Sequence, residues 1–191
     1  MNDYIVKLKK YCNYDFGYEL LGNYIRVRVD DDISYEYDLK RCSISMYERD
    51  KRSEVGCWDN RRISDCWFAS ILKSSFEAGI DYGDSTSYEG AGSLQELNEL
   101  LKKRFDDSLF SVGLIEEKKL SLICNSGRYQ IMYLYNGANR VIEESDDKEY
   151  MFGRFYREIV ALEFSYRDLK EYIMVFGVEF TEDEYRELLY S

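Results

Sequence analysis

The sequence contains no histidine among its 191 residues. Histidine is the base of Ser-His-Asp and Cys-His catalytic sites, and its ordinary pKa lies nearest neutrality. Hydrolases that need such a base, and zinc sites that need imidazole, are therefore excluded. We expect a binding protein rather than an enzyme, with no catalytic residue, no metal and no cofactor.

Proline is also absent, which excludes cis-proline turns and proline-rich linkers. Long apolar runs are missing as well, because no stretch approaches the roughly 20 residues that cross a bilayer. The N-terminus, MNDYIVKLKK, lacks the basic-then-apolar order of a signal peptide. The protein is therefore expected to stay in the cytoplasm, without membrane contact.

Cysteine occurs only five times, an odd number, and the spacing includes no C-x-x-C. This pattern disfavours both a disulfide framework and a ribbon-type zinc site. We expect free thiols that pack as small hydrophobic side chains. The five residues are Cys12, Cys42, Cys57, Cys66 and Cys124.

Apolar residues, by contrast, are plentiful, at 45% of the chain with 16% aromatic, which is enough for a core. In the first part, alternation of apolar and polar residues predicts an antiparallel meander. Its strands are expected near residues 4–8, 25–29, 33–39 and 44–46, with a hairpin turn at Asp30, Asp31 and Asp32. A helix is predicted to start at Ser64 and to stop at Gly79.

The second part repeats the order of strands and helices. Ser93 and Glu96 form a capping box, which predicts a helix after residue 93. Strands are expected at 109–115, 120–124, 129–135 and 140–142, in antiparallel hairpins. Helices are predicted to start at Ser165, ending at Gly177, and at Thr181, whereas residues 150–164 fit helix and strand equally.

These patterns predict an α+β fold, with antiparallel meander sheets each packed by helices and a helical C-terminus. Residues 1–79 would form an N-terminal half and residues 93–191 a C-terminal half. The Gly- and Ser-rich stretch 80–92 would be a loop or linker between them. One compact domain is the alternative.

The net charge of −11 is unevenly placed along the sequence. Residues 1–79 carry 13 Lys/Arg and 14 Asp/Glu, whereas residues 80–191 carry 13 and 23. The segment 40–62 has a local excess of three positive charges. Because an acidic surface repels phosphates and attracts cationic grooves, we expect a basic protein partner. Nucleic acid could bind directly only at 40–62.

Two segments are the candidate partner-binding sites. The densest acidic run is expected in a loop after a strand, where it could imitate phosphates or simply maintain solubility. Tyrosine, with 19 copies, supplies contact area in protein interfaces, and two copies in the polar loop are expected to be exposed anchors. The residues are Glu143, Glu144, Asp146, Asp147, Glu149, Tyr82, Asp84 and Tyr88.

In composition, though in no motif, the chain resembles antagonists encoded by phages and mobile elements, including anti-CRISPR and anti-restriction proteins. The resemblance implies an inhibitory binding protein that blocks a basic groove of a nucleic-acid-processing enzyme. An immunity protein that neutralises a cognate toxin would show the same acidity and tyrosine content. These two functions stay open at this point.

A different class of function is a metal-dependent nuclease. Two carboxylates that hold Mg²⁺ and a lysine that assists the nucleophile form such sites. The sequence offers a loose version of this arrangement, which a polar hairpin tip would also explain. The residues are Asp106, Asp107, Glu116, Glu117 and Lys119.

Overall fold

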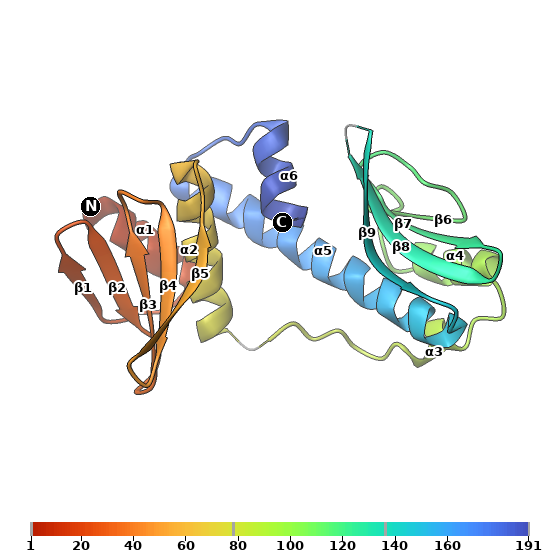
Figure 1. Cartoon of the computed structure of the whole chain (residues 1–191), viewed down its shortest axis with the longest axis horizontal. Helices are drawn as coiled ribbons and strands as arrows, with labels where there is room; N and C mark the ends of the chain where they lie inside the picture. The colour runs from red at the N-terminus through yellow and green to blue at the C-terminus, as the bar shows by residue number, and fades with distance from the viewer. Residues whose placement is uncertain (1, 78, 136, 191) are drawn as a thin grey trace. The chain divides into compact units, whose positions relative to one another are not determined.

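The computed structural model describes residues 2–77, 79–135 and 137–190, except for the side chains of Arg186 and Tyr190. The chain forms two compact units. Unit 1 comprises Met1–Gly79 and Arg167–Ser191, and unit 2 comprises Ile80–Tyr166. Each unit contains one sheet packed with helices, so the α+β expectation is confirmed (Figure 1). Within the described residues, no helix has the length and apolarity to cross a membrane.

Unit 1 is built on a five-stranded antiparallel meander in the order β1-β2-β3-β4-β5. Strands β2, β3 and β4 lie where the alternation predicts them, whereas β1 and β5 were not predicted. The turn between β2 and β3 forms where expected, because the Asp30 carboxylate accepts the N–H groups of Asp32 and Ile33 at 2.8 and 2.6 Å. The elements are α1 (Asn2–Cys12), β1 (Tyr18–Leu21), β2 (Tyr24–Arg28), β3 (Ile33–Asp38), β4 (Ser43–Glu48), β5 (Lys51–Cys57), α2 (Arg61–Phe76) and α6 (Glu182–Tyr190).

The predicted strand at residues 4–8 is wrong, because this segment belongs to helix α1. Its buried residues are spaced three to four apart, as on one face of a helix, and Val6 is 65% exposed. Helices α1 and α2 cover one face of the sheet, and the core between them contains Leu8, Ile25, Tyr37, Ile44 and Phe68. The short alternation of Tyr4, Val6 and Leu8 therefore does not indicate a strand.

Helix α2 begins at Arg61 rather than at Ser64. The side chain of Asn60 caps it by accepting the N–H of Arg62 at 2.9 Å. Ser64 lies fully buried inside the helix, where its hydroxyl is hydrogen-bonded to that of Tyr37 at 2.6 Å. The helix ends at Phe76, before the predicted stop.

Unit 2 contains a four-stranded sheet in the order β6-β7-β8-β9. Strands β7, β8 and β9 are antiparallel as expected, but β6 pairs parallel with β7. The chain turns back between them through left-handed residues at Gly113 (φ 85°) and Lys118 (φ 63°). The elements are α3 (Thr86–Glu89), α4 (Leu94–Lys102), β6 (Phe110–Val112), β7 (Leu120–Asn125), β8 (Arg128–Tyr135), β9 (Ala138–Ser145) and α5 (Lys148–Phe176).

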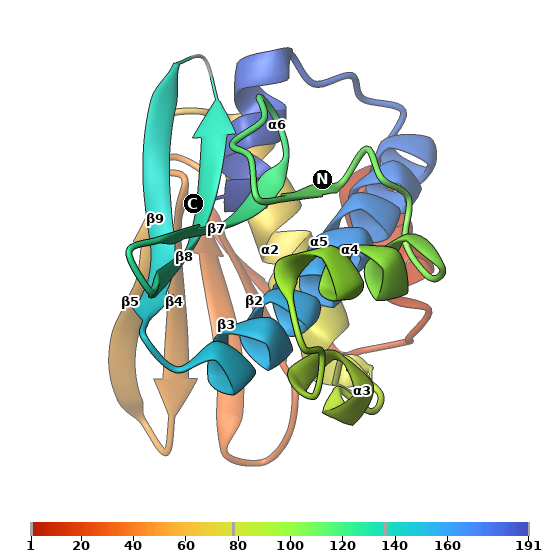
Figure 2. The same cartoon turned by 90° about the vertical axis from the view of Figure 1, so that its right-hand side faces the viewer.

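Helix α5 is a single helix of 29 residues that contributes to both units. In unit 2, α4 and α5 lie on the same side of the sheet (Figure 2), and Phe152 packs edge-on against Tyr129 with ring centroids 5.6 Å apart. The predicted helix start at Ser165 is wrong, because the Ser165 hydroxyl donates to the carbonyl of Ala161 inside the helix. The ambiguous stretch 150–164 is helical.

Three local signals are confirmed. Ser93 caps α4 by accepting the N–H of Glu96 at 3.2 Å, although the Glu96 carboxylate accepts from Gly92 rather than from Ser93 itself. Thr181 and Glu184 form a complete capping box for α6. Helix α5 ends where Gly177 adopts a left-handed conformation (φ 66°).

Candidate partner-binding surfaces

The sequence predicted a loop for the acidic run at 143–149, but this prediction is wrong, because most of the run belongs to a strand and a helix. Glu143 and Glu144 belong to β9, and Asp147 directly precedes α5. The Asp147 carboxylate accepts the N–H of Tyr150 at 3.0 Å, and its carbonyl accepts the N–H of Met151 at 3.1 Å. A negative charge at this position stabilises the helix N-terminus. Asp147 therefore has a structural role of its own.

The two predicted segments meet at the N-terminal half of α5 (Figure 1). Lys148 donates to the carbonyl of Gly92 at 3.5 Å, and the Tyr156 hydroxyl donates to the carbonyl of Tyr82 at 2.6 Å. Between them, the Glu89 side chain lies so close to Gly153 that an added Cβ would be 2.5 Å from its carboxylate oxygen. Residues 82–92 are thus fixed along the same helix that Asp147 starts.

Tyr88 is not an exposed anchor, because its side chain is buried, with a relative exposure of 9%. Its ring stacks on that of Tyr156 with centroids 4.2 Å apart. Tyr82 is 38% exposed and meets the expectation of accessibility. Asp84 is exposed, and hydrogen bonds from the hydroxyl and the N–H of Thr86 lower its pKa.

Several acidic side chains of unit 2 are neutralised by neighbours. Glu144 forms an ion pair with Arg128 at 2.5 Å and also accepts from Gln130 at 3.1 Å. Glu89 lies 3.7 Å from Arg157, and Tyr150 donates weakly to Glu143 at 3.5 Å. Glu144 and Glu89 therefore contribute little unbalanced charge.

Four carboxylates remain at one end of unit 2, and we name this group, Glu96, Asp146, Asp147 and Glu149, the acidic end. All four residues are exposed and form no ion pair within the part of the chain that the structure describes. Glu96 joins the group because its carboxylate and the Lys148 ammonium bind the N–H of Gly92 and the carbonyl of Gly92, respectively. Lys148 is the cation placed among them, which leaves a local excess of negative charge.

The fold changes how the total charge is shared. Unit 1 carries 16 Lys/Arg and 21 Asp/Glu, a net −5, and unit 2 carries 10 and 16, a net −6. The strong asymmetry along the sequence disappears because the acidic segment 167–191 folds with unit 1. Both units therefore repel polyanions over long range.

The basic segment 40–62 forms the β4–β5 hairpin and the start of α2. Most of its arginines have acidic partners, so its positive charge is largely compensated. The pairs join Arg41 to Asp38 at 3.9 Å, Arg49 to Asp32 at 3.2 Å, Arg61 to Asp65 at 3.7 Å and Arg62 to Glu184 at 2.7 Å.

The nuclease candidates lie around β6. Asp106 binds the N–H of Ser108 at 2.9 Å, and Asp107 follows it at the surface. Glu116, Glu117 and Lys119 lie in the connection from β6 to β7, where Glu116 pairs with Lys119 at 2.8 Å. Within residues 2–77, 79–135 and 137–190, no group of three or more Cys, Asp or Glu side chains is placed to hold a metal ion.

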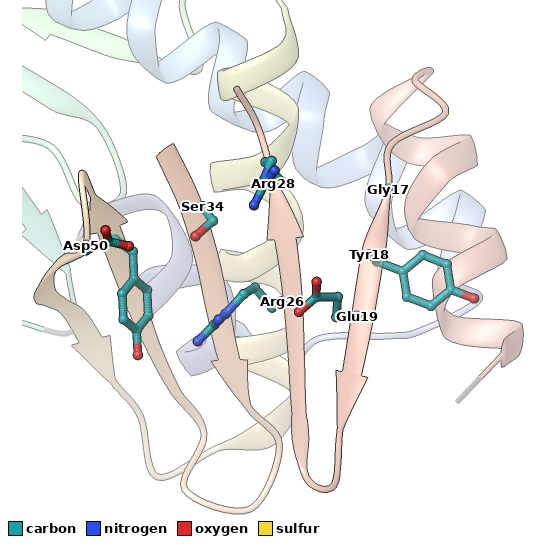
Figure 3. Close-up of a pocket in the computed structure, with 8 residues that line it drawn as sticks. Gly17, Tyr18, Glu19, Arg26, Arg28, Ser34 and Asp50 are labelled. Carbon is teal, nitrogen blue, oxygen red and sulfur yellow. The ribbon is translucent and has the colours of Figure 1, made fainter. Parts of the chain in front are cut away.

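Sequence reasoning missed a pocket in unit 1, on the sheet face that α1 and α2 do not cover (Figure 3). We call this face the open face. The pocket has a volume of about 390 Å³. Beneath it, Arg26 donates to Glu36 at 2.6 Å and lies over the ring of Tyr47. The available signal was the polar half of the alternation in β2 to β4, where Arg28, Ser34 and Tyr47 lie in register on one face of the sheet.

Comparison with protein-family models, with curated proteins and with solved structures gave no match.

Proposed function

We propose that this chain is an inhibitory binding protein that captures a cationic protein through the acidic end of unit 2. The observation that carries the proposal is a group of four exposed carboxylates that form no ion pair among the described residues, with Glu96 joined to Lys148 through the backbone of Gly92. Grooves that bind nucleic acid are lined with Lys and Arg, so they are the natural targets of such a surface. The protein would act in the cytoplasm, where these enzymes work.

The acidic end is held by the fold rather than by flexible loops. Asp147 is fixed as the cap of α5, and Glu96 is fixed by the N–H of Gly92. Preorganised carboxylates lose little conformational entropy when a partner binds. Tyr82, exposed beside the same helix about two and a half turns further along, would supply additional apolar contact area.

Two biological settings fit this proposal equally. Counter-defence against a nucleic-acid-processing enzyme, as by anti-CRISPR proteins, requires an acidic surface that competes with the nucleic acid. Neutralisation of a cognate toxin by an immunity protein requires the same complementarity. The identity of the partner decides between them.

The test uses a triple variant, Asp146→Asn, Asp147→Asn and Glu149→Gln. Asparagine is a good helix cap, so α5 should keep its start. A partner captured from the native host with the intact chain is purified, and its Kd is measured at several salt concentrations. We expect the variant to bind at least about tenfold more weakly and with a shallower salt dependence, because screening acts on fewer charges.

The matched control is Asp107→Asn, Glu116→Gln and Glu163→Gln, which removes the same charge from exposed positions elsewhere in unit 2. The control should retain most of the affinity. If both variants lost the same affinity, the effect would come from the overall net charge. If the test variant bound the partner unchanged, the acidic end would be excluded as the binding surface.

A further inference from the structure

The pocket on the open face is a polar groove that crosses four strands of unit 1. Glu19 comes from β1, Arg26 and Arg28 from β2, Ser34 from β3 and Tyr47 from β4, and Asp50 lies in the turn after β4. Figure 3 shows Glu19 beside Arg26, with Arg28 and Ser34 further along the strands and Asp50 at the far side. Carboxylates therefore stand at both ends of the groove, with arginine between them.

Arg26 is already engaged by the fold. Its guanidinium donates to Glu36 at 2.6 Å, and the Tyr47 hydroxyl donates to the same carboxylate at 3.2 Å. The hydrogen bond to Glu36 raises the pKa of Arg26, so the guanidinium stays charged beside this carboxylate. Arg26 thus lines the groove while it is bound to Glu36, and the other charged groups of the lining are left to a ligand.

Glu19, Arg28 and Asp50 are the charges that remain. All three side chains are exposed, and none forms an ion pair within the described residues. Ser34 is the register partner of Arg28 across β2 and β3, so its hydroxyl adds a second donor beside the guanidinium. From one end of the groove to the other, the charges are therefore negative at Asp50, positive at Arg28 and negative at Glu19.

Asp50 occupies a turn position at which the backbone conformation favours glycine. The β4–β5 turn has two residues, Arg49 (φ 48°) and Asp50 (φ 66°), and both adopt the left-handed conformation. Turns of this kind favour Asn-Gly, because glycine has no steric cost there. The Asp50 carboxylate makes no hydrogen bond within the described residues, so the fold gains nothing visible from it. A role in binding would account for its presence.

We propose that this groove binds an extended peptide segment of the protein partner, with basic side chains at Glu19 and Asp50 and a carboxylate at Arg28 and Ser34. From β1 to β4 the groove spans three strand spacings, about 14 Å. In an extended peptide, residues i, i+2 and i+4 point the same way at intervals of about 7 Å, so five residues cross the four strands. Asp50 lies five positions beyond Ser45, the residue of β4 in register with Glu19, so the long basic side chain must reach along the strands as well. Two terminal carboxylates would repel the continuous phosphates of a nucleic acid.

The inference rests on the proposed function in one respect, that the partner is a protein rich in basic residues. It concerns a different unit, so the two can fail separately. The probe is acetyl-Lys-Gly-Glu-Gly-Lys-amide, titrated into the full ¹⁵N-labelled chain and followed by NMR. We expect the amide signals of Gly17, Glu19, Ser34 and Asp50 to shift together. The reversed-charge peptide acetyl-Glu-Gly-Lys-Gly-Glu-amide and a thymidine pentanucleotide should leave them unchanged.

Variants locate the effect. Glu19→Gln with Asp50→Asn should weaken binding of the probe about tenfold, and asparagine tolerates the left-handed turn. The matched control, Glu48→Gln with Glu54→Gln, removes the same charge from exposed residues of β4 and β5 that do not line the pocket. Equal weakening in both, no shifts with the probe, or stronger binding of the reversed peptide or the oligonucleotide would overturn the inference. Loss of partner binding in the acidic-end variant, with the probe peptide still bound in the groove, would agree with the groove inference, because the two sites lie in different units.

Discussion

Lys73 and Glu171 form an ion pair of 2.6 Å in unit 1, although Lys73 is only 4% exposed. The ammonium also lies 3.2 Å from Asp168 and over the ring of Tyr11 at 4.7 Å from its centroid. This network joins α1, α2 and the C-terminal part of α5. A lysine is rarely buried unless it is paired, so these carboxylates are required for its position.

Replacing Lys73 by Met should therefore destabilise the protein by about 2 kcal/mol, since it leaves two carboxylates without their cation. Burial acts to lower the pKa of Lys73, but Glu171 and Asp168 outweigh it and raise the pKa above its ordinary value. A raised pKa gives stability that is present below the unfolded pKa, about 10.4, and is lost as pH rises through the folded value. Urea unfolding at pH 7 and pH 11 measures both effects, and equal pH dependence in the variant would contradict them.

Glu184 should make unit 1 sensitive to acid. Burial acts to raise its pKa, but the N–H of Thr181, Asn60 and Arg62 outweigh it and lower the pKa. Such a group stabilises the fold above its unfolded pKa, about 4.3, and the contribution is lost as pH falls through the folded value. Glu184→Gln should cost about 1–3 kcal/mol at pH 7 and much less at pH 3. Circular dichroism during urea unfolding provides the measurement, and Glu179→Gln, an exposed position, should change little.

Gly56 in β5 is required by the ring of Trp58. A Cβ at this position would lie 2.5 Å from the ring, which itself stacks on Trp67 with centroids 6.0 Å apart. Gly56→Ala should displace Trp58, shift tryptophan fluorescence to longer wavelength and cost about 1–3 kcal/mol. Gly17→Ala is the control, because a Cβ there meets nothing within 4 Å. Unchanged fluorescence in Gly56→Ala would show that Trp58 has another place to go.

Asp50→Gly should stabilise the protein while it weakens binding of the basic probe peptide. Glycine removes the left-handed strain at φ 66°, which is worth up to about 1 kcal/mol. Thermal or urea unfolding reports the stability, and the NMR titration reports the binding. If glycine destabilises the turn, the Asp50 side chain has a structural role that the contacts do not show.

The nuclease alternative predicts that the protein cleaves nucleic acid, whereas the proposed binding function predicts no cleavage. We expect the purified protein to leave labelled RNA and DNA intact, both with Mg²⁺ and with EDTA. Cleavage that needs Mg²⁺, stops with the chelator and is lost in Glu117→Ala would replace the binding function by catalysis near β6 and β7. A gel assay is sufficient to decide.

Local signals in the sequence predicted local structure well. Ser93, Thr181 and Gly177 mark helix ends through contacts with residues three or four positions away, so their effect does not depend on the rest of the fold. Strands β2, β3 and β4 were predicted because their apolar residues alternate and one face is buried. Strands β1 and β5 were missed because they are exposed almost throughout and leave no such pattern. The predicted elements account for most of the α+β architecture.

Elements decided by distant contacts were missed. Tyr4 to Leu8 alternate for only three apolar residues, and the burial of Leu8 and Tyr11 between α2 and α5 is what makes the segment helical. Ser165 resembles a cap, but the apolar residues before it continue the helix through that position. The open-face groove depends on side chains from four strands, and its charge pattern exists only after β1 to β4 pair in register.

The division of the chain has a consequence for its synthesis. Leu169, Tyr172 and Phe176 near the end of the chain complete the core that Leu8 and Tyr11 begin near its start. Residues 80–166 form their own unit in between, so the ribosome releases the inserted unit before the α5 partners of the first helix exist. Helices α1 and α2 can cover the meander early, but the side of α1 that packs on α5 has no cover during that interval, and this side is where a chaperone would be needed most.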